Sequence, residues 1–271
     1  MVSEPASSPI VAKPIRQGDA FPAGALRTEL DPEFAKRAGQ RIWQSECEGT
    51  KLGLTSWNEG EDFASLGIGH FLWFPKDKEF EFEESFPEFL DYYRSLPASE
   101  PMPDWLTMAV DCPWANRDEF LGARDDKRMI ELREFLFATV PEQTRFVYRR
   151  LLASRSKILE LASPEKRNHL DDRFAALSRT TEGQYAMMDY VNFKGEGTNP
   201  KERYEGQGWG LFQVLETMNP ALRERDAVVD FSRAAEAMLR RRVENHPEDA
   251  RWIEGWSHRT RAYSQPFEAL P

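Results

Sequence analysis

Apolar side chains recur at helical spacing over most of this 271-residue chain. The clearest helix start is Asp31 followed by Pro32, because Asp caps free N–H groups and Pro fits the first helical position. Gly49 is a typical helix end. The pattern predicts an amphipathic helix over residues 31–49, with Glu48 in its last turn. The apolar residues that share one face of it are Phe34, Ala38, Ile42, Trp43 and Cys47.

The rest of the pattern divides the chain into a short β-rich part and a long helical part. Residues 51–74 combine apolar pairs with spaced glycines, which predicts short strands and a small sheet. Helical periodicity predominates downstream. Residues 1–30 are rich in proline and are predicted to be extended or disordered. We expect an α+β fold that is mainly α, with one domain over residues 31–271, β-containing at about 49–75 and helical at about 76–271.

The net charge of the chain limits the classes of partner that it can bind. The sequence has 36 basic and 46 acidic side chains, a net charge of −10. Such a charge argues against nucleic-acid binding and against attraction to anionic lipid. The acidic residues concentrate between Lys76 and Leu96, where aromatic and acidic residues alternate before a helix that follows Pro87. We interpret these acids as a solvated face.

The sequence also gives expectations about membrane spans, cellular location, cysteine pairing and cofactors. No apolar run reaches eighteen residues, so no membrane span is predicted. The start of the chain has no hydrophobic signal region. We expect a periplasmic or secreted monomer whose signal peptide has been removed, with a cytoplasmic protein as the alternative. Cys47 and Cys112 allow one disulfide at most, and their oxidation state is open. The four scattered His give no zinc pattern, and no metal or organic cofactor is expected.

The candidate chemistry lies between Glu48 and His70. Glu48 and Glu59 flank a glycine-rich bend, and Ser65 follows. Glycoside cleavage uses a protonated acid on the leaving oxygen and a second carboxylate. Glu48 lies beside apolar residues that can desolvate it, whereas Glu59 lies in a polar turn and should stay ionised. The alternative is that both are ordinary acids of a helix end and a turn.

The stretch EGTKLGLTSWNEGEDFASLGIGHFL resembles the active-site segment of bacteriophage-type lysozymes. That family has a helix-ending Glu-Gly, an aromatic residue, an Asp two residues later, and a Thr leading into Gly-Ile-Gly-His. Here Glu48 matches the acid and Trp57 the aromatic residue. Glu59 stands in place of Asp, Ser65 stands in place of Thr, and residues 67–70 match. Two extra residues separate Glu48 from Trp57. The Glu for Asp exchange at position 59 alters the expected carboxylate separation.

Weaker likenesses follow along the chain. VNFKGEG, GLFQVLETMN and WIEGWSHRTRAY resemble, in the same order, later segments of that family. Residues 76–180 match nothing in it. Glu196 and the segment ending in Gln213 also resemble the Glu…Gly-Leu-x-Gln segment of lytic transglycosylases, which use one Glu as acid and base. Glu196 is therefore a second candidate acid.

The resemblance implies a lysozyme-like fold and a muramidase that cuts β-1,4 bonds between the amino sugars of peptidoglycan. Glu48 would protonate the leaving oxygen, Glu59 would stabilise charge or activate water, and Ser65 would place that water. Residues expected to support catalysis or bind substrate are His70, Trp57, Phe63, Glu196 and Gln213. A lytic transglycosylase and an inactive glycan-binding protein of the same fold are the alternatives. The net negative charge favours deacetylated peptidoglycan, whose amines are cationic.

Overall fold

A computed structural model describes residues 26, 29–78, 80, 83–97, 101–109 and 111–267. Most of the chain is helical, and it carries one small antiparallel sheet of three strands. The predicted mainly-α class is therefore confirmed. Most of the segment predicted to be extended or disordered lies outside the described residues. Of the helices in the described part, none is long and apolar enough to cross a membrane.

The elements follow one another along the chain with short connections. The α-helices are α1 (Pro32–Cys47), α2 (Phe86–Arg94), α3 (Asp104–Thr107), α4 (Arg117–Gly122), α5 (Lys127–Ala138), α6 (Val140–Leu161), α7 (Pro164–Leu177), α8 (Thr181–Lys194), α9 (Leu211–Thr217), α10 (Glu224–Asn245) and α11 (Ile253–Ala262). The strands are β1 (Thr55–Ser56), β2 (Ala64–Leu66) and β3 (Phe71–Trp73). Two 3₁₀ helices are η1 (Leu52–Leu54) and η2 (Pro247–Trp252).

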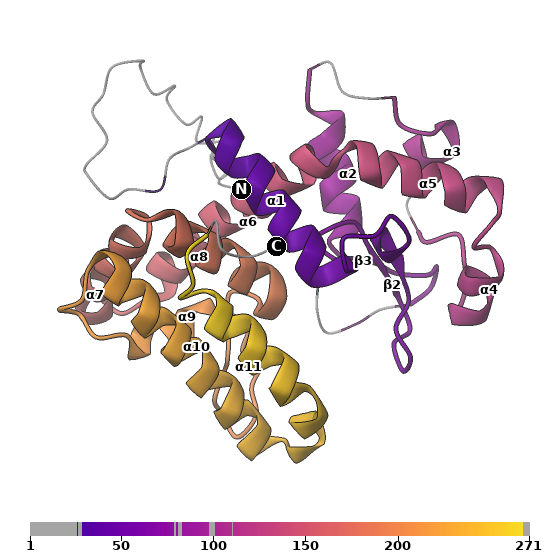
Figure 1. Cartoon of the computed structure of the whole chain (residues 1–271). Coiled ribbons are helices and arrows are strands. Elements are labelled where there is room, and N and C mark those ends of the chain that lie inside the picture. The colour runs from indigo at the N-terminus through magenta and orange to yellow at the C-terminus, as the bar shows by residue number, and fades with distance from the viewer. Residues whose placement is uncertain are drawn as a thin grey trace, which may run out of the picture.

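Helix α1 is central to the arrangement. Figure 1 shows it between a part that contains the sheet with α2–α5 and a part that contains α7–α11. Asp31 caps its start, with Oδ1 accepting the N–H of Phe34 at 2.9 Å. Glu48 ends the helix in the left-handed conformation, with φ of 53°. The predicted start and end of this helix are confirmed, and α1 packs against α6 and α8.

The sheet is held to the helices by the turn between β2 and β3. Strand order is β1-β2-β3, with Ser65 paired to Ser56 on one side and Leu72 on the other. Gln143 of α6 accepts the N–H of Ile68 at 2.8 Å. Gly67 has φ of +68°, and a Cβ there would meet Gln143 Oε1 at 2.2 Å. Only glycine fits this close approach without strain.

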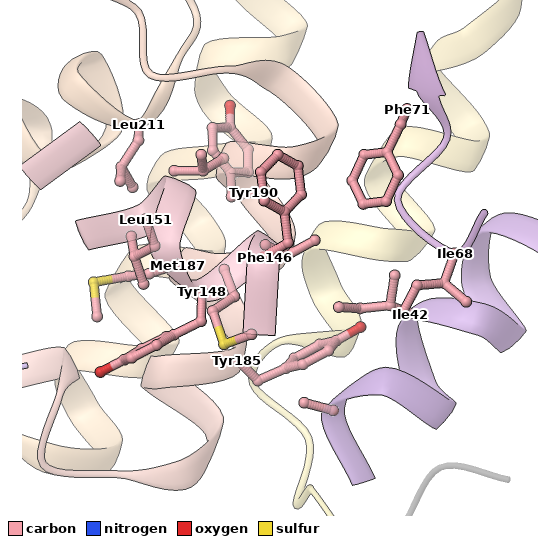
Figure 2. Packing of buried hydrophobic residues seen from close by; sticks show 14 of the residues in the cluster. Ile42, Ile68, Phe71, Phe146, Tyr148, Leu151, Tyr185, Met187, Tyr190 and Leu211 are labelled. Carbon is pink, nitrogen blue, oxygen red and sulfur yellow. The ribbon is translucent and has the colours of Figure 1, made fainter. Parts of the chain in front are cut away.

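The core runs through both parts of the molecule. Figure 2 shows side chains from α1, β3, α6 and α8 in one cluster. Phe71 of β3 stacks on Phe89 of α2 and packs edge-on against Phe146 of α6, each with ring centroids 5.3 Å apart. Trp73 is fully buried. This packing fixes the sheet against α6 and so fixes one wall of the cavity described next.

Candidate functional site

A cavity of about 780 Å³ opens between the sheet and the helices. Its walls come from the end of α1, the loop and strands of the hairpin, α2, α6, the end of α8 with the loop that follows, and the η2–α11 region. A cavity of this size can enclose a ligand of several rings. The lining residues with polar or aromatic side chains used below are Glu46, Glu61, Phe63, Ser65, His70, Glu83, Glu88, Arg150, Lys157, Asn192, Glu196, Glu202, Trp252 and Trp256.

At the end of α1, the carboxylate that faces the cavity is Glu46. Its side chain is 12% exposed and lines the cavity. Glu48, the predicted acid, is an exposed residue outside the lining. Glu48 lies just beyond the last helical residue, Cys47, in the left-handed conformation, whereas Glu46 belongs to the helix itself. The expected place of Glu48 at the cavity is therefore corrected, because Glu46 is the acid of this helix end that lines it.

In the hairpin, the corresponding correction is from Glu59 to Glu61. Glu59 is exposed in the turn before Gly60 and lies outside the lining. Glu61 lines the cavity, and its Oε2 accepts the Asn58 side-chain N–H at 2.9 Å. Burial raises the pKa of Glu61, and the hydrogen bonds from Asn58 oppose this rise only in part. The loop therefore exposes one acid and desolvates the other.

Glu46 belongs to a buried charged network behind the cavity. Arg259 of α11 donates to Glu46 Oε1 at 2.5 Å and to both oxygens of Asp189, at 2.7 and 2.8 Å. The Tyr263 hydroxyl also donates to Asp189, at 2.5 Å. Burial alone would raise the pKa of Asp189, but the charge and hydrogen bonds of Arg259 lower it overall. We call Glu46, Asp189, Arg259 and Tyr263 the buried network.

His70 lines the cavity beside Glu46. Its Nδ1 lies 3.6 Å from Glu46 Oε2. Burial lowers the pKa of His70, the nearby Arg259 lowers it further, and Glu46 opposes the shift. The ring is therefore neutral at pH 7. Its Nε2 is buried and has no hydrogen-bond partner among the described residues. His70 is therefore placed at the cavity, next to Glu46.

Two of the other hairpin residues reach the cavity, whereas Trp57 supports it from behind. Ser65 lines the cavity from the middle of β2, and Phe63 lines it from the preceding loop. Trp57 is 4% exposed, packs against Phe120 and lies outside the lining. Its indole N–H donates to the carbonyl of Glu61 at 2.7 Å. The predicted contact of Trp57 with substrate is thus replaced by a role in holding the Glu61 loop.

The segment after α8 contributes Glu196 but not Gln213. Glu196 lines the same cavity and is engaged by Lys157 and by the Thr198 hydroxyl. Gln213 is buried and bonds to the Gly210 N–H and the Gly197 carbonyl, at 3.0 and 2.9 Å. It closes the glycine-rich loop and lies outside the lining, so its predicted substrate contact is corrected.

Several lining residues were not predicted. Glu83 and Glu88 come from the acidic stretch that was interpreted as a solvated face, and its aromatic–acidic alternation was the only signal. Arg150 and Lys157 lie seven residues apart on α6, a spacing that places them on one helical face. Trp252 is 51% exposed at the edge of the cavity. The fold assembles these residues from separate elements.

The cysteines and acids of the described chain do not suggest metal chemistry. Within the described ranges, no group of three or more His, Cys, Asp or Glu could hold a metal ion. Cys47 and Cys112 are both free and buried, which answers the question of their pairing. Burial raises the pKa of each thiol to about 12, so neither is an activated nucleophile.

Comparison of this chain with models of known protein families, with curated proteins and with solved structures finds no match.

Proposed function

We propose that this chain is a lysozyme-like glycoside hydrolase that cleaves β-1,4 bonds between the amino sugars of peptidoglycan. A small sheet and a helical part contribute opposite walls of one cavity. The segment from Trp57 to His70, whose sequence carries the resemblance to bacteriophage-type lysozymes, supplies part of its lining. The observation that carries the proposal is the convergence of Glu46 and Glu61 on this cavity in different environments.

The two environments suit the two roles that glycoside cleavage requires. Burial raises the pKa of Glu61, so this carboxyl keeps its proton to higher pH and would protonate the leaving oxygen. The Arg259 guanidinium donates a charge-assisted hydrogen bond to Glu46 and holds that carboxylate at the cavity. Glu46 would then stabilise the positive charge that develops on the sugar ring or activate water. Glu46 and Glu61 thus replace Glu48 and Glu59 in the proposed mechanism.

The neighbouring groups fit supporting roles. The Ser65 hydroxyl lines the cavity and could hold the attacking water, as first expected. His70 lies beside Glu46, and its buried Nε2, unpartnered among the described residues, is positioned to bind an internal water. Phe63 and Trp252 offer aromatic surfaces to the apolar faces of sugar rings.

A lytic transglycosylase is the second candidate because Glu196 opens onto the same cavity. Glu196 is, however, engaged by Lys157 and by the Thr198 hydroxyl, so one of its carboxylate oxygens, Oε1, is already occupied in this structure. The products distinguish the two reactions. A hydrolase leaves a reducing end, whereas a transglycosylase leaves an anhydro end that mass spectrometry detects.

The test is the release of soluble fragments from purified peptidoglycan. We expect Glu46→Gln and Glu61→Gln each to lower the rate by about 10²- to 10⁴-fold, because each removes an acid–base or charge-stabilising group. Glu48→Gln and Glu59→Gln are matched controls from the same helix end and the same hairpin loop, and they should retain wild-type activity. Wild-type protein that releases no fragments, or full activity in Glu46→Gln, would refute the proposal. If the wild-type protein releases no fragments, the remaining hypothesis is an inactive glycan-binding protein.

A further inference from the structure

One wall of the cavity has more acids than its basic groups can balance. Glu83 and Glu88 come from α2 and the residues before it, and Glu196 and Glu202 come from the loop after α8. Arg150 and Lys157 of α6 also line this cavity. We call the four carboxylates the acidic wall. The groups of the wall carry four formal negative charges against two positive ones.

The charges of the acidic wall act on one another. Burial raises the pKa of Glu88, and the charge of Glu83 raises it further while Arg150 opposes the rise. Burial raises the pKa of Glu202, and the charges of Glu196 and Glu83 add to this effect. Carboxyls from two different elements therefore share one negative potential, which a cation in the cavity would relieve.

The available basic groups are already committed. Lys157 pairs with Glu196. Arg150 lies close enough to Glu88, Glu196 and Glu83 for their charges to affect it. In the described part of the chain, neither Glu83 nor Glu202 forms an ion pair within 4 Å, although Lys157 influences Glu202. Two carboxylates at the cavity thus retain capacity for a bound cation.

Other lining groups indicate that the cation is carried by a sugar. Asn192 donates to the carbonyl of Gly69 at 3.1 Å, but its own Oδ1 is buried and unpartnered among the described residues. Trp252, half exposed, lines the same cavity and offers ring surface to a pyranose. Trp256 also lines it, with the Lys194 Nζ over one ring face at 3.6 Å from the centroid.

We propose that the acidic wall is a subsite that binds the ammonium group of a de-N-acetylated amino sugar, and that it selects such glycans over acetylated ones. This inference rests on the proposed function for the class of polymer. It assigns a role to four carboxylates that the cleavage mechanism does not use. An acetamido group at the same place is neutral, so the carboxylates would remain unbalanced beside it.

The test compares two oligosaccharides that differ only in acetylation. Hexamers of β-1,4-linked glucosamine and of N-acetylglucosamine are titrated into Glu46→Gln protein by calorimetry at mildly acidic pH, where the amines are protonated. We expect at least about tenfold tighter binding of the glucosamine hexamer at low salt, with a smaller preference at high salt because the attraction is electrostatic. Equal affinity, or tighter binding of the acetylated hexamer, would overturn the proposal.

Substitutions test whether the preference for the glucosamine hexamer comes from the acidic wall. Glu83→Gln/Glu202→Gln, made in the same background, should abolish this preference while leaving the affinity for the acetylated hexamer within about twofold. The matched control is Glu165→Gln/Glu244→Gln, which removes the same charge from exposed positions on α7 and α10 and should keep the preference. Equal loss of preference in both variants would mean that net charge, not the acidic wall, is recognised, and would overturn the proposal.

Failure of this inference is distinguishable from failure of the proposed function. Wild-type protein that releases no fragments from native or deacetylated peptidoglycan, but binds the glucosamine hexamer through the acidic wall, lacks the proposed activity and keeps the subsite. Wild-type protein that hydrolyses both polymers with no preference keeps the activity and lacks the subsite. A basic peptide that binds the acidic wall more tightly than the glucosamine hexamer would also overturn the sugar assignment.

Discussion

The buried network and the acidic wall both contain carboxylates, but they differ in how many of those carboxylates have ion-pair partners. In the buried network, Asp189 is fully buried and accepts hydrogen bonds from Arg259 and Tyr263. In the acidic wall, Glu83 and Glu202 face an open cavity without an ion-pair partner in the described part of the chain. Partners fix the first group in place, whereas the second has surplus charge that water reaches.

This difference separates charged clusters that stabilise the fold from charged clusters that bind a ligand. A buried ionised group is tolerated only when its partners satisfy it, so it supports the fold. Carboxylates that crowd one another at a cavity cost stability, and the cost is relieved by a ligand of opposite charge. Glu46 links the two situations, because it pairs with Arg259 on one side and lines the cavity on the other.

The largest effect should come from breaking the buried network. Asp189→Asn removes the negative charge that faces Arg259 and replaces one of its two acceptor oxygens by an amide NH2 group. Removing one partner of a buried ion pair costs about 3–5 kcal/mol, and urea denaturation measures that loss. Glu88→Gln is the control from the acidic wall and should change the free energy of unfolding by less than about 0.5 kcal/mol. Similar losses in the two variants would contradict the comparison.

The next largest effect should come from Gln143, a neutral side chain whose buried polar atoms are also hydrogen-bonded. Gln143 is fully buried, accepts the N–H of Ile68 and donates to the carbonyl of Leu136 at 2.6 Å. Gln143→Leu leaves both backbone groups without this partner, which costs about 1–3 kcal/mol for each buried polar group left unsatisfied. The expected result is a lower urea midpoint and faster amide exchange at Ile68. An exposed glutamine changed in the same way, Gln265→Leu, should cost far less.

Local signals in the sequence were sufficient to predict the helix and the small sheet that carry the cavity residues. Asp31, Pro32 and Gly49 act within a few residues of themselves, so the limits of α1 could be predicted. The spaced glycines likewise predicted the small sheet, whose turn needs the positive φ of Gly67. Ser65 and His70 follow from the same stretch and do reach the cavity.

The sequence did not predict which acids line the cavity, because distant residues decide that placement. Glu46 is distinguished from Glu48 by its partner Arg259, which is 213 positions away in the sequence. Glu61 is distinguished from Glu59 by desolvation within the folded loop. The acidic stretch around Glu83 has the composition of a solvated surface, and only the placement of α2 beside the cavity gives it another meaning. None of these facts is encoded by local periodicity.

A smaller effect is a pH dependence of opposite sign in the two regions. Carboxyls with raised pKa bind protons more readily when folded, so Glu88 and Glu202 destabilise the protein increasingly as pH rises above their ordinary value of 4.5. Asp189, with a lowered pKa, instead stabilises the fold above its ordinary value of 3.8 and loses this effect as pH falls.

Urea midpoints measured from about pH 4 to about pH 8 separate these contributions. Glu88→Gln/Glu202→Gln should be less destabilised than wild type as the pH rises, because it lacks two of the groups that repel one another. The control Glu165→Gln/Glu244→Gln should follow the wild-type curve. A variant of the acidic wall that becomes less stable relative to wild type with rising pH would show that Glu88 and Glu202 are stabilising, contrary to the comparison.

The smallest effect separates Glu48 from Glu46 directly. Glu48 adopts a left-handed φ of 53° at the end of α1, a conformation that glycine adopts more easily than other residues. Glu48→Gly should therefore stabilise the protein by about 0.5–1 kcal/mol and leave glycan cleavage unchanged. Thermal denaturation and the peptidoglycan assay measure the two quantities on the same sample. A loss of cleavage in a variant that gains stability would return the catalytic role to Glu48, because a purely structural residue cannot produce that combination.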